Sequence, residues 1–129
     1  MGKPHYLMDT NAVIDYLGNK IPAAGMGFMN EVMNTEPQVS VITKIEVLGF
    51  NAPEEHYRLL AHFMNDVTIL NLTGEIVETC INIRKMCRIK LPDAIIAATS
   101  LTYNLVMITR NIADFKNIHG LHLVNPHSL

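Results

Sequence analysis

Four acidic residues occupy positions from which a folded chain could bring them together. Asp9 and Asp114 follow apolar segments that are expected to be strands, whereas Glu46 and Asp93 lie in the first turns of expected helices. In an open parallel α/β sheet, the segments that follow the carboxyl ends of the strands meet at one edge of the sheet. We therefore expect these four carboxylates to share one site.

Carboxylates crowded in this way need a cation. Like charges raise one another's pKa values unless a positive ion neutralises them. A ligand set made only of oxygen atoms selects a hard divalent ion such as Mg²⁺ or Mn²⁺. A partly hydrated ion of this kind can activate water and stabilise a phosphate group under attack. The candidate metal ligands and catalytic residues are therefore Asp9, Glu46, Asp93 and Asp114.

Each acid also has a purely structural explanation. Asp9 could cap the helix that follows it, and Thr43-x-x-Glu46 fits a capping box. Asp114 could cap a turn, and Asp93 could serve only its own helix, whose dipole favours a carboxylate in the first turn. The coincidence of all four at one sheet edge favours a shared site over four separate caps.

Other polar and basic residues flank the acids. Thr10, Thr109 and Asn111 could hold a metal-bound water or a phosphate oxygen, although turn and capping roles also explain residues of these types. The densest basic run leads into the helix of Asp93, and its cations also suit the negative end of the preceding helix. The candidates for binding a phosphate backbone are Arg84, Lys85, Arg88, Lys90 and Arg110.

Strands and helices alternate along the chain. Short apolar runs predict strands at 6–8, 39–42, 67–70, 105–109 and 121–124. Segments with helical spacing or capping signals predict helices at about 10–17, 23–34, 43–49, 53–65, 73–88 and 92–104. Helices between successive strands favour an α/β fold in which a short, mostly parallel sheet lies between helical layers. We expect residues 1–129 to form a single domain.

The helix that begins near Pro92 is expected to be the buried centre of this fold. Proline has its φ angle preset for a first helical turn, and its missing N–H would be unpaired there in any case. The following segment, Ala94–Ala98, is apolar on all sides, which is typical of a helix covered from several directions. Asp93 would therefore be held rigidly at the mouth of a buried helix.

The composition narrows the class of protein. A chain of 129 residues with 49% hydrophobic residues is long and apolar enough for a real core. Its formal net charge of −2 becomes +2 when the four acids are set aside, so charge neither supports nor excludes binding to RNA. The sequence shows no membrane span or signal-peptide core. Cys80 and Cys87 are expected to be buried, reduced thiols in a cytoplasmic protein.

Several motifs resemble the PIN domain, and more narrowly the VapC toxins of bacterial and archaeal type II toxin–antitoxin pairs. They are Asp9-Thr10-Asn11, Glu46, Leu91-Pro92-Asp93-Ala94-Ile95-Ile96-Ala97-Ala98 and Thr109-Arg110-Asn111-x-x-Asp114-Phe115. The resemblance covers essentially the whole chain. It implies a PIN-like three-layer sandwich and an endoribonuclease that depends on Mg²⁺ or Mn²⁺. It also implies that the enzyme is a homodimer held inactive by a cognate antitoxin.

The resemblance assigns roles residue by residue. The catalytic acids carry over to Asp9, Glu46, Asp93 and Asp114, with Thr10, Thr109 and Asn111 as supporting polar residues. Two other functions remain as alternatives. A non-catalytic PIN-like module that binds RNA or a partner would be expected to have lost some of the acids. A phosphatase that forms an aspartyl phosphate needs a second Asp two residues after the first, where this chain has Asn11.

The second expected helix suggests a surface for the antitoxin. Met26, Phe28, Met29, Val32 and Met33 lie within eight residues, and a helix can turn only part of such a set toward one core face. We therefore expect the remainder to form an exposed apolar patch of the kind that marks an interface.

Overall fold

The computed structural model describes residues 4–129 of the chain. The strands are β1 (Tyr6–Met8), β2 (Gln38–Ser40), β3 (Thr68–Leu70), β4 (Val106–Ile108) and β5 (Leu123–Val124). The helices are α1 (Thr10–Leu17), α2 (Ala23–Met33), α3 (Val41–Leu48), α4 (Glu54–Asp66), α5 (Gly74–Met86), α6 (Leu91–Thr102) and α7 (Ile112–Phe115), followed by the short 3₁₀ helix η1 (Pro126–Ser128).

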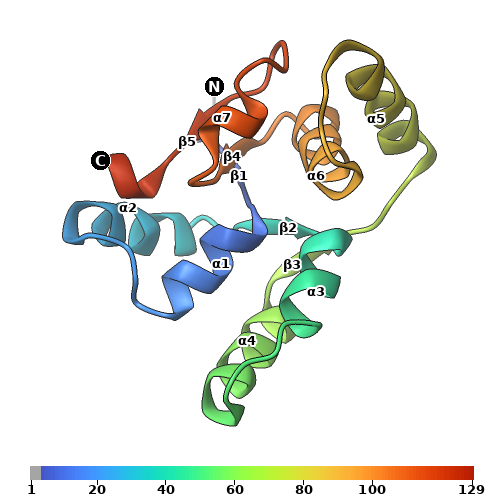
Figure 1. Ribbon diagram of the computed structural model, residues 1–129. Coiled ribbons are helices and arrows are strands. Elements are labelled where there is room, and N and C mark those ends of the chain that lie inside the picture. Colours follow the sequence, from blue (N-terminus) through green and yellow to red (C-terminus); the bar gives the residue numbers. More distant parts are fainter. Residues whose placement is uncertain (1–3) are drawn as a thin grey trace.

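The five strands form one sheet in the order β3-β2-β1-β4-β5, and every pairing between neighbours is parallel. Figure 1 shows α5, α6 and α7 on one side of the sheet region, and α1 and α2 on the other. The predicted α/β fold with helices on both faces is confirmed, and the sheet is wholly rather than mostly parallel. The strand order reverses between β1 and β4, which is where parallel α/β sheets usually place a site.

Alternate residues of the strands enter two separate cores. Leu7 and Met107 belong to the cluster beneath α5 and α6, whereas Met8, Val39 and Ile108 belong to the cluster beneath α1 and α2. Successive side chains of a strand point to opposite faces, so β1 and β4, which contribute to both cores, are apolar throughout. These strands are short, but the layers on either side leave almost none of their side chains exposed to solvent.

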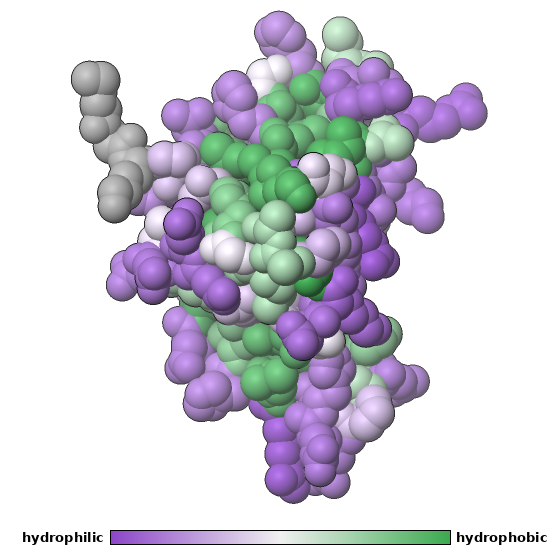
Figure 2. All heavy atoms as spheres, turned by 90° about the vertical axis from the view of Figure 1, so that its left-hand side faces the viewer, coloured by the Kyte–Doolittle hydropathy of each residue, from purple (hydrophilic) through white to green (hydrophobic). Residues whose placement is uncertain are grey.

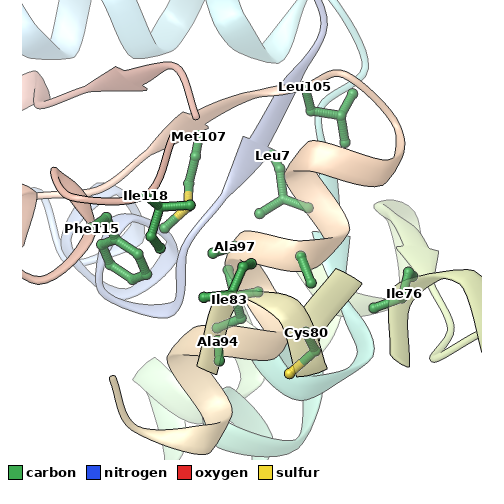
Figure 3. Close-up of a cluster of buried hydrophobic side chains, with 12 residues drawn as sticks. Leu7, Ile76, Cys80, Ile83, Ala94, Ala97, Leu105, Met107, Phe115 and Ile118 are labelled. Atoms are coloured by element: carbon green, nitrogen blue, oxygen red, sulfur yellow. The ribbon is translucent and has the colours of Figure 1, made fainter. Parts of the chain in front are cut away.

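Helix α6 is buried as the sequence predicts. Ala94, Ala97 and Ala98 are fully covered, and Figure 3 shows Ala94 and Ala97 between the strands and the side chains of α5. Their small side chains let α5 pack closely on α6. On α5 itself, Cys80 is a buried free thiol, and burial raises its pKa. Pro92 lies in the first turn of α6 but is preceded there by Leu91.

The region around the second strand differs from the prediction. The apolar run 39–42 was expected to be all strand, but Val41 and Ile42 form the first turn of α3. Ser40 caps this helix, because its hydroxyl oxygen accepts a hydrogen bond of 3.1 Å from the backbone N–H of Ile42. The capping box at Thr43 and Glu46 is therefore wrong. Both residues lie inside α3, where their side chains are available for other contacts.

The expected apolar patch on α2 is also wrong. Met29 and Val32 are buried, while Met26, Phe28 and Met33 are partly buried against the same core. Figure 2 looks onto the α2 side of the molecule, where apolar residues run down the middle of the face between polar flanks. Helix α2 is covered by the sheet and also by η1, which packs against it. Packing against both the sheet and η1 leaves α2 with less exposed apolar surface than the sequence suggested.

Among residues 4–129, no helix is long and apolar enough to cross a membrane.

Candidate active site

The four predicted acids come from four elements that end or begin at the same edge of the sheet. Asp9 follows β1, Glu46 lies in α3 after β2, Asp93 lies in the first turn of α6, and Asp114 lies in α7 after β4. The negative charges of the other three all act on Asp93 and raise its pKa. The four acids therefore share one electrostatic environment.

Asp9 is the most buried of these acids, with 3% of its surface exposed, and its carboxylate is held from several directions. Its Oδ2 accepts hydrogen bonds from the Thr109 hydroxyl at 2.8 Å and from Asn11 Nδ2 at 3.0 Å. Its Oδ1 accepts one from the backbone N–H of Thr10 at 2.8 Å, so Asp9 also caps α1. Burial, together with the charge of Glu46, raises the pKa of Asp9, and these three hydrogen bonds lower it only in part. This carboxylate is fixed in direction, and among residues 4–129 no basic side chain forms an ion pair with it.

Glu46 is joined to Asp9 through the residue that follows Asp9. The Thr10 hydroxyl donates a hydrogen bond of 2.6 Å to Glu46 Oε1, and its oxygen lies 3.1 Å from the hydroxyl oxygen of Thr43. Thr43 is fully buried, whereas Glu46 is exposed at the rim. Thr10 thus positions the Glu46 side chain toward the site, which is the supporting role that the resemblance implies for it.

Asp93 is half-buried at the mouth of α6. Burial and, to a smaller extent, the charges of Asp9, Asp114 and Glu46 together raise its pKa to about 6, and Lys90 offsets this increase only in part. The N-terminus of a helix normally stabilises a carboxylate. The raised pKa shows that desolvation and repulsion outweigh that effect. A helix cap alone would not carry this energetic penalty, which favours a functional role for Asp93.

The raised pKa of Asp93 predicts how stability depends on pH. Between its ordinary value of 3.8 and about 6, the folded protein binds more protons than the unfolded chain. The metal-free protein should therefore become more stable as the pH is lowered from about 7 to about 5. Thermal denaturation in EDTA across this range would measure the effect. Asp93→Asn should flatten the profile, and an unchanged profile in that variant would assign the pH dependence to other groups.

The donor set of the site fits a hard, hydrated divalent ion. All four candidate ligands offer carboxylate oxygens, and the hydroxyls of Thr10 and Thr109 add neutral oxygen atoms. Within the described residues 4–129, no three acidic, histidine or cysteine side chains are arranged closely enough to hold an ion together. Mg²⁺ usually keeps several water ligands and is bound directly by one or two carboxylates. The arrangement therefore suits Mg²⁺ or Mn²⁺ better than a fully protein-coordinated metal.

Asn111 has a different role from that of Thr109. Thr109 is buried, and its hydroxyl oxygen also accepts a hydrogen bond of 3.1 Å from the backbone N–H of Asn111. The Asn111 side chain makes no capping hydrogen bond to α7, and the backbone carbonyl of Asn111 accepts from the N–H of Asp114 instead. The backbone of Asn111 therefore shapes the turn, while its exposed side chain remains available at the site.

A cleft of about 780 Å³ opens beside two of the acids. It lies between the loop that joins α5 to α6 and the segment around α7, and both Asp93 and Asp114 line it. Arg88 and Lys90 line the same cleft, whereas Arg84 and Lys85 line a neighbouring hollow with Arg88. The predicted basic strip is thus divided, and only part of it adjoins the acids.

Arg110 lies apart from that strip. Its guanidinium donates a hydrogen bond of 2.9 Å to the buried carboxylate of Asp15. At least one of the guanidinium nitrogens therefore points toward the protein interior. Neither this ion pair nor the role of Asn11 was predicted from the sequence. Asn11 belongs to the Asp9-Thr10-Asn11 motif, and an amide two residues after a buried acid was the available signal. No local pattern indicated Asp15.

Comparisons with known proteins agree with this geometry. Residues 6–121 match the family model described as the PIN domain, so the chain belongs to the PIN domain family. A chain in a toxin–antitoxin complex from Klebsiella pneumoniae is 30% identical, with a TM-score of 0.76, over 94% of this chain and 97% of that one.

Two further solved structures share the fold. DNA-bound VapBC from Salmonella typhimurium contains a chain that is 24% identical, with a TM-score of 0.79, over 96% of this chain and 99% of that one. A chain of VapBC-1 from nontypeable Haemophilus influenzae is also 24% identical, with a TM-score of 0.75, over 94% of this chain and 97% of that one. No curated protein matches the sequence.

Proposed function

We propose that this PIN domain is an endoribonuclease that depends on Mg²⁺ or Mn²⁺ and acts as the toxin of a toxin–antitoxin pair. The observation that carries the proposal is the state of Asp9. A buried carboxylate with a raised pKa, held by Thr109 and Asn11 but paired with no cation among the described residues, is suited to receive a metal ion. The charge of Glu46 also acts on Asp9, and Asp93 is in turn repelled by Asp9, Asp114 and Glu46.

Each of the four acids would have its own role in the reaction. When bound, Mg²⁺ or Mn²⁺ supplies a Lewis acid that activates water and neutralises charge on the phosphate. Asp9 and Glu46, oriented by Thr109 and Thr10, would hold the ion. Asp93 has a pKa of about 6, which suits a carboxylate that accepts a proton from attacking water near neutral pH. Asp114, exposed on α7, would complete the ligand set from the opposite side of the cleft.

RNA would be held by charge beside the acids. Arg88 and Lys90 line the cleft that contains Asp93 and Asp114, so a phosphate bound by these cations would lie next to the carboxylates. Arg84 and Lys85 would contact the RNA strand at a greater distance from the acids. The apolar walls Ile89 and Ile118 offer room for a base that is not paired in a duplex. These contacts would keep substrate at the site despite the local negative charge.

The two alternative functions are less well supported. An aspartyl-phosphate phosphatase needs a second carboxylate two residues after the first, but Asn11 occupies that position and donates its amide to Asp9. A non-catalytic RNA-binding module has no need for four acids that repel one another, and the raised pKa of Asp93 shows that this repulsion is present. The intact acidic set therefore favours the nuclease.

The nuclease is tested by incubating purified protein with total RNA and mapping the cut sites. Cleavage should require Mg²⁺ or Mn²⁺, should stop when EDTA removes the ion, and should return when either metal is added back. The same ions should raise the melting temperature, because a ligand that binds only the folded state stabilises it by RT ln(1 + [L]/Kd). Cleavage that survives thorough chelation would contradict the metal mechanism, and binding of RNA without cleavage would support the non-catalytic module.

The toxin role is supported by the likeness to a chain of the toxin–antitoxin complex from Klebsiella pneumoniae, which extends over nearly the full length of both chains. We propose an antitoxin partner, a homodimer and a cytoplasmic location on this basis. A protein encoded in the neighbouring reading frame should inhibit cleavage when it is added to the purified enzyme. Sedimentation at several concentrations would establish whether the chain is a dimer before the partner binds.

A further inference from the structure

Asp15 is a buried carboxylate that lies outside the acidic site. Only 3% of the residue is exposed, and it lies one helical turn beyond Asn11 on α1. Its Oδ2 is 2.9 Å from Arg110 Nη1 and 3.1 Å from His127 Nε2. A buried charge is expensive unless it is paired, and removing one partner of such a pair is strongly destabilising. Both partners come from the last 20 residues of the chain.

The two partners of Asp15 lie in different parts of the structure, one beside the candidate active site and one in the C-terminal 3₁₀ helix. Arg110 lies two residues after the end of β4, between Thr109 and Asn111 of the candidate active site. His127 belongs to η1, which packs against α2. The Asp15 carboxylate therefore ties the turn after β4 and the C-terminal 3₁₀ helix to the same point on α1. We call Asp15, Arg110 and His127 the clamp.

The clamp is connected to Asp9 through hydrogen bonds. The backbone N–H of Arg110 donates to Asn11 Oδ1 at 3.1 Å, which directs Asn11 Nδ2 toward Asp9 Oδ2 at 3.0 Å. Thr109, the residue before Arg110, donates its hydroxyl to the same Asp9 oxygen at 2.8 Å. Both side-chain donors to Asp9 Oδ2 thus depend on where the segment 109–111 is held.

We propose that Asp15 is a positioning residue of the active site, and that it acts by clamping Arg110 and the C-terminal 3₁₀ helix against α1. The clamp keeps Asn11 and Thr109 in place, and these two keep the Asp9 carboxylate in one orientation. Arg110 then serves the interior of the protein rather than the RNA, in contrast to the expectation from the sequence. The inference rests on the proposed nuclease function for its catalytic part.

The test compares Asp15→Asn and Arg110→Met with the wild type. Loss of a group that orients a metal ligand typically lowers metal affinity or activity about 10–100-fold. We expect a fall of this size in kcat, with KM for RNA changed by less than about twofold, and an equal rise in the Mn²⁺ concentration at half-maximal thermal stabilisation. The NMR signal of the Asn11 side-chain amide should shift in both variants. Arg110→Lys, which keeps the charge, should recover part of the activity.

A matched control is available in α4. Arg58 and Glu54 form an ion pair of 2.7 Å in which both side chains are largely exposed. Arg58→Met removes an exposed arginine–carboxylate pair of similar length that shares no residue with the clamp. It should leave kcat, the Mn²⁺ midpoint and the Asn11 signal unchanged. The double variant Asp15→Asn/Arg110→Met should be as active as the less active of the two single variants, because both substitutions remove the same contact.

Several outcomes would overturn the proposal. Unchanged kcat, Mn²⁺ midpoint and Asn11 signal in Asp15→Asn would show that the clamp is only structural. A raised KM in Arg110→Met, with normal kcat and a normal Asp15→Asn variant, would make Arg110 an RNA contact. If Asp15→Asn does not fold, Arg110→Met and Arg110→Lys decide the question. If the wild type cleaves no RNA, the nuclease proposal fails, and an unmoved Asn11 signal would then refute the clamp separately.

Discussion

Replacing Asp93 by asparagine should abolish RNA cleavage while making the metal-free protein more stable. Asparagine keeps the shape of the side chain but cannot neutralise a metal ion or accept a proton at neutral pH. A loss on the order of 10³-fold is expected, comparable to the removal of other groups that stabilise a transition state. The pKa of Asp93 is raised to about 6, so its surroundings disfavour the charge, and a neutral side chain should raise the melting temperature by a few degrees.

Asp9→Asn should also lose activity, but its effect on stability is harder to separate, because Asp9 caps α1 as well. The matched control is Glu75→Gln, which neutralises an exposed acid in the first turn of α5. That variant should cleave RNA at the wild-type rate. An Asp93→Asn protein that folds, binds RNA and still cleaves normally would remove Asp93 from the machinery. One that fails to fold would return it to a structural role.

Gly25→Ala should destabilise the protein more than any other small change in α2. A Cβ atom at this position would collide with the carbonyl oxygen of Pro126 and would lie 2.6 Å from Ile21 Cγ2. The obstructing oxygen belongs to the backbone and cannot swing aside as a side chain could. Overpacking of this kind costs about 1–3 kcal/mol. Either α2 or η1 must move, so thermal or urea denaturation should show a clear loss of stability.

Gly27 supplies the control within the same helix. A Cβ atom there meets nothing within 4 Å, so Gly27→Ala adds only the preference of alanine for helical conformation. It should stabilise the protein by roughly 0.5–1 kcal/mol. Opposite signs for two identical substitutions two residues apart would confirm that the C-terminal 3₁₀ helix is seated on Gly25. Equal effects would show that η1 can move away from Gly25 without a loss of stability.

The fold, and the meeting of the four acids at one edge of the sheet, could be predicted because the signals for them are local. Each of these signals lies within about ten residues of sequence. One is the apolar run followed by Asp9, and another is the pair Pro92 and Asp93 before an apolar helix. Contacts between distant parts of the chain are not visible in this way. The surplus apolar surface of α2 was expected in solvent because nothing near α2 in the sequence shows that η1 packs against this helix. The ion pair between Arg110 and Asp15 was not expected because the two residues are 95 positions apart in the chain.

The boundary error at Ser40 has a different cause. Val39 to Ile42 is an apolar run interrupted only by Ser40, and β-branched residues favour strands as a class. The serine hydroxyl captures the N–H of Ile42 and starts a helix in the middle of the run. A one-residue capping contact thus outweighs the propensity of its neighbours. It also moves Thr43 and Glu46 into the helix, from which they reach Thr10.

The pairing of β1 with β4 has a consequence for how the protein is made. Tyr6 lies beside Val106, and Thr109 donates to Asp9 across a separation of 100 residues. Bringing such distant residues together loses chain entropy before any contact between them stabilises the fold, and this slows folding. Parallel strands also cannot be joined by a short hairpin. Asp9 is synthesised 100 residues before Thr109, which holds its carboxylate. A nascent or truncated chain that stops before Thr109 therefore cannot assemble this arrangement of the acids.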